Sequence, residues 1–171
     1  MSERTPEHDS TPAAGGRESS NAGREDSNAG REGSNITALS HVAIAVREAD
    51  PLVETFVNAL GGTKGGEELL DQGRLRVVFI HLGPVTIELL EPRSPEHTVA
   101  KFLDSRGPGL HHVSLEVRDI VAQLAAAKAA GARLIDETPH PGAHGTQVAF
   151  LHPKSFGGVL VELCQTPRTP W

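Results

Sequence analysis

Apolar and polar residues alternate along several short segments of this chain, and one such segment occurs twice. The stretch "LSHVAIAV" begins at Leu39, and the stretch "LHHVSLEV" begins at Leu110, 71 positions later. Alternation that is rich in β-branched residues predicts a β-strand, with apolar side chains on one face and the histidine on the other. We therefore expect an internal duplication in which His41 and His112 occupy equivalent positions.

Each copy of this strand is followed by a similar order of predicted elements. In the first copy, "ADPLVETFVNAL" predicts a helix with Asp50 as its N-cap, Pro51 in its first turn and Gly61 at its end. Three strands follow, of which those in "GRLRVVFIHLG" and "VTIELLEP" form a hairpin. In the second copy, the helix "DIVAQLAAAKAAG" precedes strands in "RLIDE", "TQVAFLH" and "GVLVELC". Both copies therefore predict a βαβββ module.

The two modules together predict one α+β domain over residues 36–167. Module 36–94 and module 108–167 are joined by a short linker helix in "TVAKFLDSRG". Two such modules can pair into a curved eight-stranded mixed sheet with the helices outside and a cleft within. We expect this cleft to bind a metal, for the reasons given below.

Residues 1–35 differ in composition from this domain and predict a disordered tail. The heptapeptides "GRESSNA", "GREDSNA" and "GREGSNI" follow one another from Gly16. A seven-residue period is compatible with a coiled coil, but no position carries a recurring apolar residue, so no seam can form. Gly, Ser, Asn and charged residues bury too little apolar surface to offset the loss of chain entropy.

Composition and charge exclude several classes of protein. The formal net charge is −6 and the pI about 5.8, and no basic stripe occurs, so we do not expect a nucleic acid partner. The single cysteine, Cys164, excludes an internal disulfide and fits a reducing compartment. No apolar run approaches the ~20 residues of a membrane span, and the N-terminus lacks the order of a secretory signal. We therefore expect a soluble cytoplasmic protein with no membrane partner.

Four ligand-type side chains are predicted to share the concave face of the sheet. His41, Glu88, His112 and Glu162 each lie in a different predicted strand, where they alternate with the apolar residues under the helices. Taken singly, such residues are more often structural, but their recurrence across the duplication favours a metal site. Two imidazoles and two carboxylates can hold a divalent ion such as Co²⁺, Mn²⁺, Zn²⁺ or Ni²⁺ and leave two positions for other ligands.

Other polar residues carry weaker signals. Alternation directs His111 toward the helix face or the rim, so we interpret it as structural. Cys164 shares the face of Glu162, but no histidine is placed to activate it, and we interpret it as an inert buried thiol.

Three longer stretches carry a family resemblance: "GLHHVSLEVRDI", "IELLEPRSPEHTVAKFLDSRGPG" and "GARLIDETPHPGAHGTQVAFLHPKSFGGVLVELCQ". The paired modules and the order His, Glu, His, Glu resemble the vicinal oxygen chelate superfamily, which includes glyoxalase I and the extradiol dioxygenases. Within it, residues 38–166 resemble the methylmalonyl-CoA epimerase family. The patterns "FLHPKS…GVLVEL" and "ELLEP…AKFL" are specific to that family, whereas the four ligands are shared by the superfamily.

This resemblance implies a metal-dependent isomerase that interconverts the two C2 epimers of methylmalonyl-CoA, with His41, Glu88, His112 and Glu162 as the metal ligands. The C2 hydrogen lies between a thioester and a carboxylate, and its removal gives an enolate whose charge a divalent ion stabilises. Epimerisation needs a base on each side of this carbon, or one mobile base, and Glu162 is the candidate for one side.

The residue that serves the opposite side stays open. Some epimerases carry a glutamate after the turn "DQG", where this chain has Arg76. Gln72, in that turn, is predicted to assist through the substrate or a water, and His144 in "GAHGTQ" is another candidate. Lys154 in "HPKS" is predicted to meet a phosphate of coenzyme A. The resemblance also implies a homodimer.

Three alternatives would use the same fold. A glyoxalase I-type isomerase would share the four ligands and pass through an enediolate, but "HPKS" and "ELLEP" argue against it. An iron dioxygenase needs two histidines and one carboxylate, and Glu88 would crowd its oxygen site. A non-enzymatic module that sequesters a ligand would have no use for four metal ligands.

Overall fold

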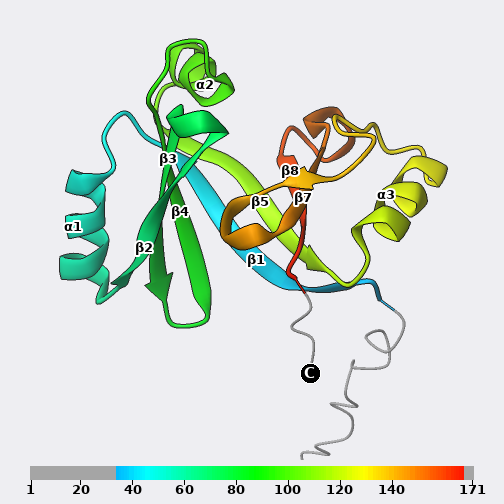
Figure 1. Cartoon of the computed structure of the whole chain (residues 1–171), viewed down its shortest axis with the longest axis horizontal. Coiled ribbons are helices and arrows are strands. Elements are labelled where there is room, and N and C mark those ends of the chain that lie inside the picture. The colour runs from blue at the N-terminus through cyan, green and yellow to red at the C-terminus, as the bar shows by residue number, and fades with distance from the viewer. Residues whose placement is uncertain (1–33, 168–171) are drawn as a thin grey trace, which may run out of the picture. The chain divides into compact units, whose positions relative to one another are not determined.

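The computed structural model describes residues 34–167, which form a curved sheet of eight strands with three helices (Figure 1). The predicted tail lies outside the described residues, apart from its last two positions. One of these, Asn35, belongs to the folded part, because its side chain donates to the carbonyl oxygen of Asp119 (2.6 Å) and accepts from the Asp119 amide (2.9 Å). The folded part therefore includes at least one residue more than the sequence predicted.

The elements follow one another in the order that the duplication predicts. The first module contains β1 (Ile36–Ala45), α1 (Asp50–Leu60), β2 (Thr63–Leu70), the 3₁₀ turn η1 (Asp71–Gly73), β3 (Leu75–Leu82) and β4 (Val85–Pro92). The linker helix is α2 (Thr98–Arg106). The second module contains β5 (Gly109–Val117), α3 (Ile120–Ala129), β6 (His140–Pro141), η2 (Ala143–Gly145), β7 (Gln147–Leu151), η3 (Pro153–Ser155) and β8 (Leu160–Gln165).

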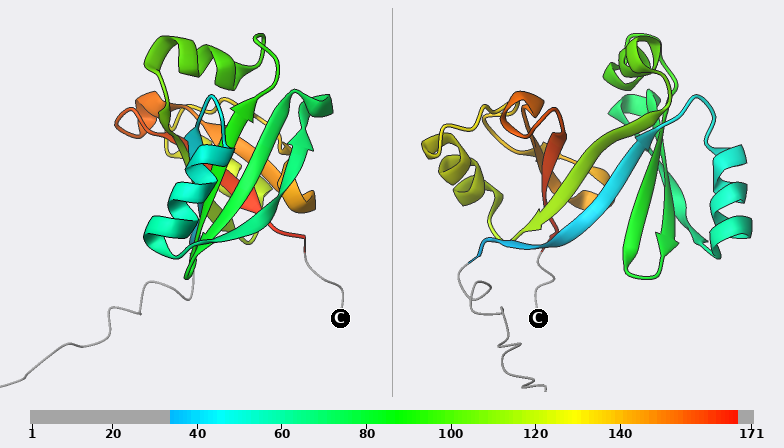
Figure 2. Two further views of the ribbon diagram at one scale, coloured as in Figure 1. Left: turned by 90° about the vertical axis from the view of Figure 1, so that its left-hand side faces the viewer. Right: turned by 180° about the vertical axis from the view of Figure 1, so that it is seen from behind.

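The two modules join along their first strands. The strand order is β2-β3-β4-β1-β5-β8-β7-β6, with β1 and β5 antiparallel at the centre (Figure 2). Within the modules, β1 runs parallel to β4 and β5 runs parallel to β8, while the remaining neighbours are antiparallel. The predicted mixed sheet of paired βαβββ modules is thus confirmed.

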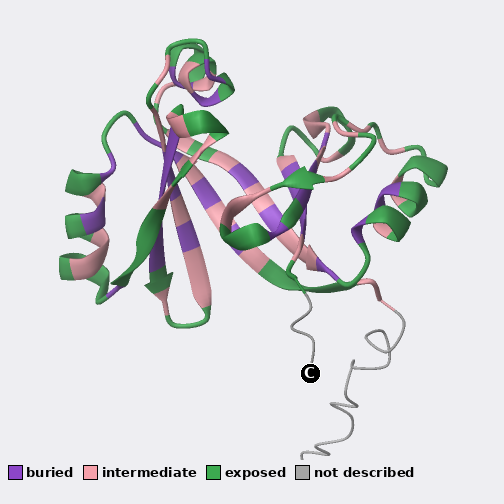
Figure 3. Ribbon diagram, in the orientation of Figure 1, coloured by how far each residue is buried: buried purple, intermediate pink, exposed green. Residues whose placement is uncertain are grey.

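The apolar residues lie where strand alternation predicts. Buried and partly buried residues alternate over residues 40–45 of β1 and 111–115 of β5 (Figure 3). Val46, Ile87 and Leu89 pack with Val53 of α1 on the outer face of the first module. Val161 and Leu163 pack in the same way with Leu124 of α3 on the outer face of the second module. Burial of these side chains, at about 25 cal/mol per Å² of apolar surface, is the main term that holds each helix to its sheet.

The linker helix differs from the other two helices in its position. Val99 and Leu103 of α2 pack against Ala43 and Leu90, which lie on the same face of the sheet as the predicted ligands. The helices of the two modules, α1 and α3, lie outside as predicted, whereas the linker helix α2 covers one end of the concave face. The physical reason is that this face also carries apolar residues, which need a cover.

Two local predictions are wrong as well. Ala49, and not Asp50, is the N-cap of α1, and the Asp50 carboxylate instead accepts from the Arg76 guanidinium at 2.8 Å. The segment "RLIDE" forms only an isolated bridge between Leu134 and Leu151, because the amides of both Ile135 and Asp136 donate to one carbonyl, that of Phe150. The strand that completes the second module is β6 instead.

None of the helices that the structure describes is long and apolar enough to span a membrane.

Candidate metal centre

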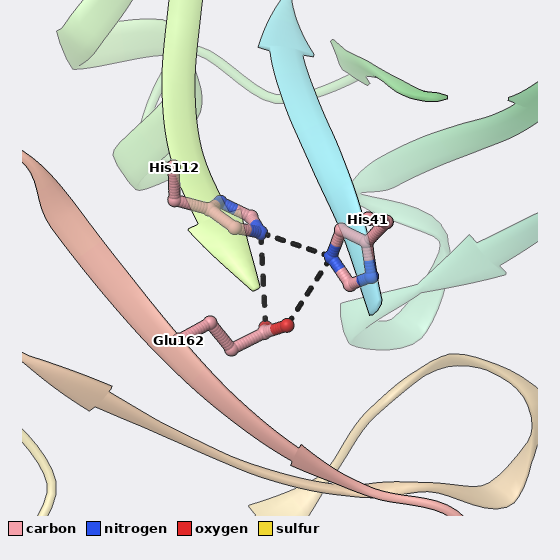
Figure 4. A group of neighbouring side chains, drawn as sticks. All are labelled: His41, His112 and Glu162. Carbon is pink, nitrogen blue, oxygen red and sulfur yellow. Dashed lines mark hydrogen bonds and ion pairs between the residues drawn. The ribbon is translucent and has the colours of Figure 1, made fainter. Parts of the chain in front are cut away.

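Three of the four predicted ligands converge on one point at the centre of the sheet. Nε2 of His41 lies 3.2 Å from Nε2 of His112 (Figure 4). Oε2 of Glu162 lies 3.2 Å from Nε2 of His41, and Oε1 of Glu162 lies 3.8 Å from Nε2 of His112. All three residues are buried. They come from the adjacent strands β1, β5 and β8, in which Ser114 is the register partner of both His41 and Glu162. The small, fully buried Ser114 lets the three larger side chains approach one another.

The chemistry of these three residues fits a bound cation. One ligand atom from each can be chosen such that all lie within 4.8 Å of one another. Oε2 of Glu162 is buried and makes no hydrogen bond within residues 34–167. An unsatisfied buried carboxylate oxygen is costly, and a divalent ion between it and two imidazole nitrogens would remove that cost. His41, His112 and Glu162 are therefore the residues that could hold a metal.

Glu88, the fourth predicted ligand, lies on the same face but beside the other nitrogen of His41. Its Oε1 is 3.3 Å from Nδ1 of His41, whereas the other three residues meet at Nε2. Burial raises the pKa of Glu88 to about 7 despite the opposing effect of His41. In this conformation Glu88 is a neighbour of a ligand. Glu88 would need a different side-chain conformation to bring its carboxylate to the common point.

Burial and mutual contact set the charges of the three convergent residues. Burial lowers the pKa of His112 to about 3, which leaves a neutral imidazole. Burial also opposes protonation of His41, but contact with Glu162 and the charge of Glu88 outweigh it and raise the pKa of His41. Burial would raise the pKa of Glu162, but contact with His41 and the nearby His112 lower it below its ordinary value. Metals bind neutral imidazole and ionised carboxylate, which are the forms favoured for His112 and Glu162. A bound cation would have to displace the proton that the raised pKa favours on His41.

His111 also faces this cleft, contrary to the prediction that it points to the helix face or the rim. The register between β1 and β5 pairs Ala43 with His112 and Ile44 with Leu110, so His111 is an extra residue in a β-bulge. Its Nδ1 lies 2.9 Å from Nδ1 of His112, and burial lowers its pKa to about 4. Strand alternation cannot locate a bulge, because the bulge depends on the partner strand, and we find no sequence signal that would have revealed it.

The convergent residues lie in a cavity of about 570 Å³ on the concave face. Its apolar walls come from both modules and from α2, and include Leu75, Val77, Phe79, Leu90, Val99, Val148, Phe150 and Leu160. This size suits the acyl part of a small-molecule substrate, and apolar walls strengthen the electrostatic interactions of charged groups within.

The other predicted functional residues differ in their relation to this cavity. His144 lines it, with Nδ1 held 2.6 Å from Oε1 of Glu68 and its ring packed on Phe79. Gln72 is exposed and is not a lining residue, while its neighbour Asp71 is. Lys154 is exposed in η3 and also lies outside the lining.

Two further residues can be located on opposite sides of the sheet. The Arg76 guanidinium lies away from the cavity, where it pairs with Asp50, Glu67 and Glu91, so this position of β3 does not present a side chain to the cleft. Cys164 lines the cavity, is buried, and has a pKa raised by burial, as expected for an unreactive thiol.

Residues 40–150 match the sequence profile of the Glyoxalase/Bleomycin resistance protein/Dioxygenase superfamily. The chain belongs to this superfamily. The resemblance to the vicinal oxygen chelate fold is thereby confirmed. An ethylmalonyl-CoA/methylmalonyl-CoA epimerase of Cereibacter sphaeroides is 42% identical over 132 residues, which are 76% of this chain and 98% of the relative.

Solved structures of superfamily members agree with the fold. The methylmalonyl-CoA epimerase of Mycobacterium tuberculosis superposes with a TM-score of 0.75 at 34% identity, over 80% of this chain and 92% of that chain. A methylmalonyl-CoA epimerase in complex with methylmalonyl-CoA and NH4+ superposes with a TM-score of 0.72 at 28% identity, over 79% of this chain and 99% of that chain.

Proposed function

We propose that this protein is a metal-dependent epimerase that interconverts the two C2 epimers of methylmalonyl-CoA through an enolate. Similarity to epimerases over nearly the whole folded region supports the substrate class. The observation that carries the proposal is the convergence of His41, His112 and Glu162, with an unsatisfied buried oxygen, in the lining of a cavity. A module that only sequesters an apolar ligand would have no use for this arrangement.

The chemistry of the reaction suits these residues. A divalent ion held by His41, His112 and Glu162 would supply positive charge beside the thioester and carboxylate oxygens of the substrate. Contact with His41 and the nearby His112 lower the pKa of Glu162, which keeps its carboxylate ionised. Glu162 therefore serves as the base for one side of C2.

The proton on the opposite side needs a different group. His144 lines the cavity from η2 and is oriented by Glu68, which supports it as the partner of Glu162. Gln72 would need to turn inward to take part, since it is exposed and Asp71 is the lining residue of that turn. Lys154 is exposed, as a residue that meets a phosphate of coenzyme A must be. Co²⁺, Mn²⁺, Zn²⁺ and Ni²⁺ all suit the donor set, and a homodimer in the cytoplasm completes the proposal.

Deuterium exchange at C2 tests this function. The full chain is incubated with methylmalonyl-CoA in D₂O, and mass spectrometry follows the gain of one deuteron. We expect rapid exchange, loss of exchange after treatment with a chelator, and recovery on addition of one of the four metals. The Cereibacter relative is named an epimerase of ethylmalonyl-CoA as well as methylmalonyl-CoA, so ethylmalonyl-CoA is the second substrate to test. The metal-loaded chain exchanging neither acyl-CoA would refute the proposal, and turnover of a glutathione hemithioacetal instead would favour a glyoxalase I-type isomerase.

A further inference from the structure

We propose that His111 is a positioning residue that fixes the tautomer and orientation of His112, so that Nε2 of His112 presents a lone pair to the metal centre. This inference rests on the metal dependence in the proposed function. It concerns a residue that strand alternation would direct away from the cleft.

The two nitrogens of His112 have different partners on opposite sides of its ring. Nε2 faces the centre, 3.2 Å from Nε2 of His41. Nδ1 faces His111, 2.9 Å from the Nδ1 atom of that ring. The second contact has the length of a hydrogen bond between nitrogens, so one of the two Nδ1 atoms carries the hydrogen and the other accepts it.

The direction of this hydrogen bond follows from the role of Nε2. An imidazole nitrogen that binds a cation uses its lone pair, so in a neutral ring the hydrogen sits on the other nitrogen. In His112 that nitrogen is Nδ1, which then donates to Nδ1 of His111. The opposite direction would put a hydrogen on Nε2 of His112, where it would point at the centre and exclude a cation.

The position of the acceptor ring is fixed by its surroundings. The β-bulge in β5 turns His111 toward the cleft, and its ring packs edge-on against Phe102 of α2 with 4.9 Å between centroids. The first module has an equivalent arrangement, because Nδ1 of His41 lies 3.2 Å from the Ser40 hydroxyl and 3.3 Å from the Glu88 carboxylate. Each imidazole of the centre thus has an acceptor at Nδ1, and such outer partners orient metal-binding histidines and raise their basicity.

Two substitutions separate the acceptor from the ring. His111→Phe keeps an aromatic ring against Phe102 but removes the nitrogen that accepts from His112. His111→Asn loses the ring but offers an amide oxygen close to the place of Nδ1. If the acceptor matters, His111→Asn should rescue what His111→Phe loses, whereas packing alone would give the reverse order.

The experiment is a titration of the metal-free full chain with Co²⁺ in competition with a chromophoric chelator, without any acyl-CoA. We expect His111→Phe to lower the affinity about 10–100-fold, the usual effect of losing such an outer partner, and His111→Asn to retain most of it. The visible spectrum of bound Co²⁺ should be unchanged in His111→Asn. Unchanged affinity in His111→Phe, or equal losses in both variants, would overturn the inference.

The same titration keeps this inference separate from the proposed reaction. If the wild-type chain binds Co²⁺ and shows the expected variant pattern, but exchanges no deuterium into methylmalonyl-CoA, the role of His111 stands and the epimerase proposal fails. If it exchanges deuterium in a chelator-sensitive way while the variants bind Co²⁺ like the wild type, the reaction stands and the role of His111 fails. A wild-type chain that binds no Co²⁺, Mn²⁺, Zn²⁺ or Ni²⁺ overturns the role of His111.

Discussion

His41 and His112 are separated by 71 positions in the chain, yet their Nε2 atoms lie 3.2 Å apart. The pairing of β1 with β5 brings them together, since His41 pairs with Ser114 and Ala43 pairs with His112. The two histidines are therefore diagonal neighbours on one face of the sheet. Because each module supplies one imidazole, the centre forms only when the two modules pair.

Replacement of Glu162 by glutamine should abolish deuterium exchange while the chain still folds. Glutamine has nearly the same volume, but it cannot accept the C2 proton, and general bases contribute about 10²–10⁴-fold to rate. Exchange is measured as above, and circular dichroism checks the fold. Glu137→Gln is the matched control, because Glu137 is exposed, pairs with Lys128 and does not line the cavity. Exchange by Glu162→Gln at the wild-type rate would contradict the role of Glu162 as a base.

Replacement of Ser114 by valine should weaken metal binding although it replaces none of the ligand residues. Ser114 is fully buried and pairs with both His41 and Glu162, so a larger side chain must push these residues apart. Overpacking of this kind typically costs about 1–3 kcal/mol of stability. Thermal unfolding and Co²⁺ titration measure the two effects. Ser114→Ala, which adds no bulk, should bind Co²⁺ nearly as well as wild type, and equal affinity in Ser114→Val would show that close packing here is unimportant.

The ion pairs of Arg76 should make stability depend on pH in the acid range. Hydrogen bonding to Arg76, and then to Lys64, lowers the pKa of Glu67 from 4.5 to about 2. A carboxylate with a lowered pKa stabilises the fold above its unfolded-state pKa, and this stability is lost as the pH falls through the folded-state value. The free energy of unfolding should therefore fall between about pH 4.5 and pH 2.

The contribution of Arg76 can be isolated by substitution. Arg76→Met should be less stable than wild type at pH 6, and the difference should shrink as the pH approaches 2. Urea unfolding at several pH values measures this, with Arg76→Lys as a control that keeps the charge. A difference that stays constant with pH would show that Arg76 acts through packing alone.

The contact between Glu68 and His144 should hold η2 over the cavity. Glu68 lies in β2 of the first module, and its carboxylate accepts from the backbone amide of His144 at 3.1 Å and pairs with the ring at 2.6 Å. Both side chains are partly exposed, so the stabilisation is at most about 1 kcal/mol. Glu68→Ala should speed amide hydrogen exchange in residues 143–145 and raise the KM for the acyl-CoA. Glu68→Gln, whose amide oxygen can still accept from the backbone, should show smaller changes in both.

The sequence predicts most of the fold because the duplication supplies two independent copies of each pattern. Alternation in the strands assigns faces correctly for His41, His112 and Glu162, whose side chains meet on the concave face. It fails at His111, because this residue is itself the extra residue of a bulge, and the bulge depends on the register with β1. It cannot fix the Glu88 carboxylate either, because the strand face does not determine which nitrogen of His41 a side chain will contact.

The remaining differences also depend on contacts that lie far apart in the sequence. The Asp50 carboxylate accepts a hydrogen bond from Arg76, 26 positions away, and does not cap the helix. The segment around Ile135 is kept from a regular ladder by two amides that share the Phe150 carbonyl. Local sequence patterns cannot predict contacts between residues that are so far apart in the chain.

The two walls of the cleft are chemically unequal, and this has a stereochemical consequence. Along β3 the cleft-facing residues include Leu75, Val77 and Phe79, while Arg76 is turned outward, so this wall offers no acid group. Glu162 stands on the other wall, in β8. A substrate seated between them has one enantioface toward the Glu162 carboxylate and the other toward the Phe79 wall, on which the His144 imidazole packs. We therefore expect the two hands of the substrate to lose their hydrogen at different rates.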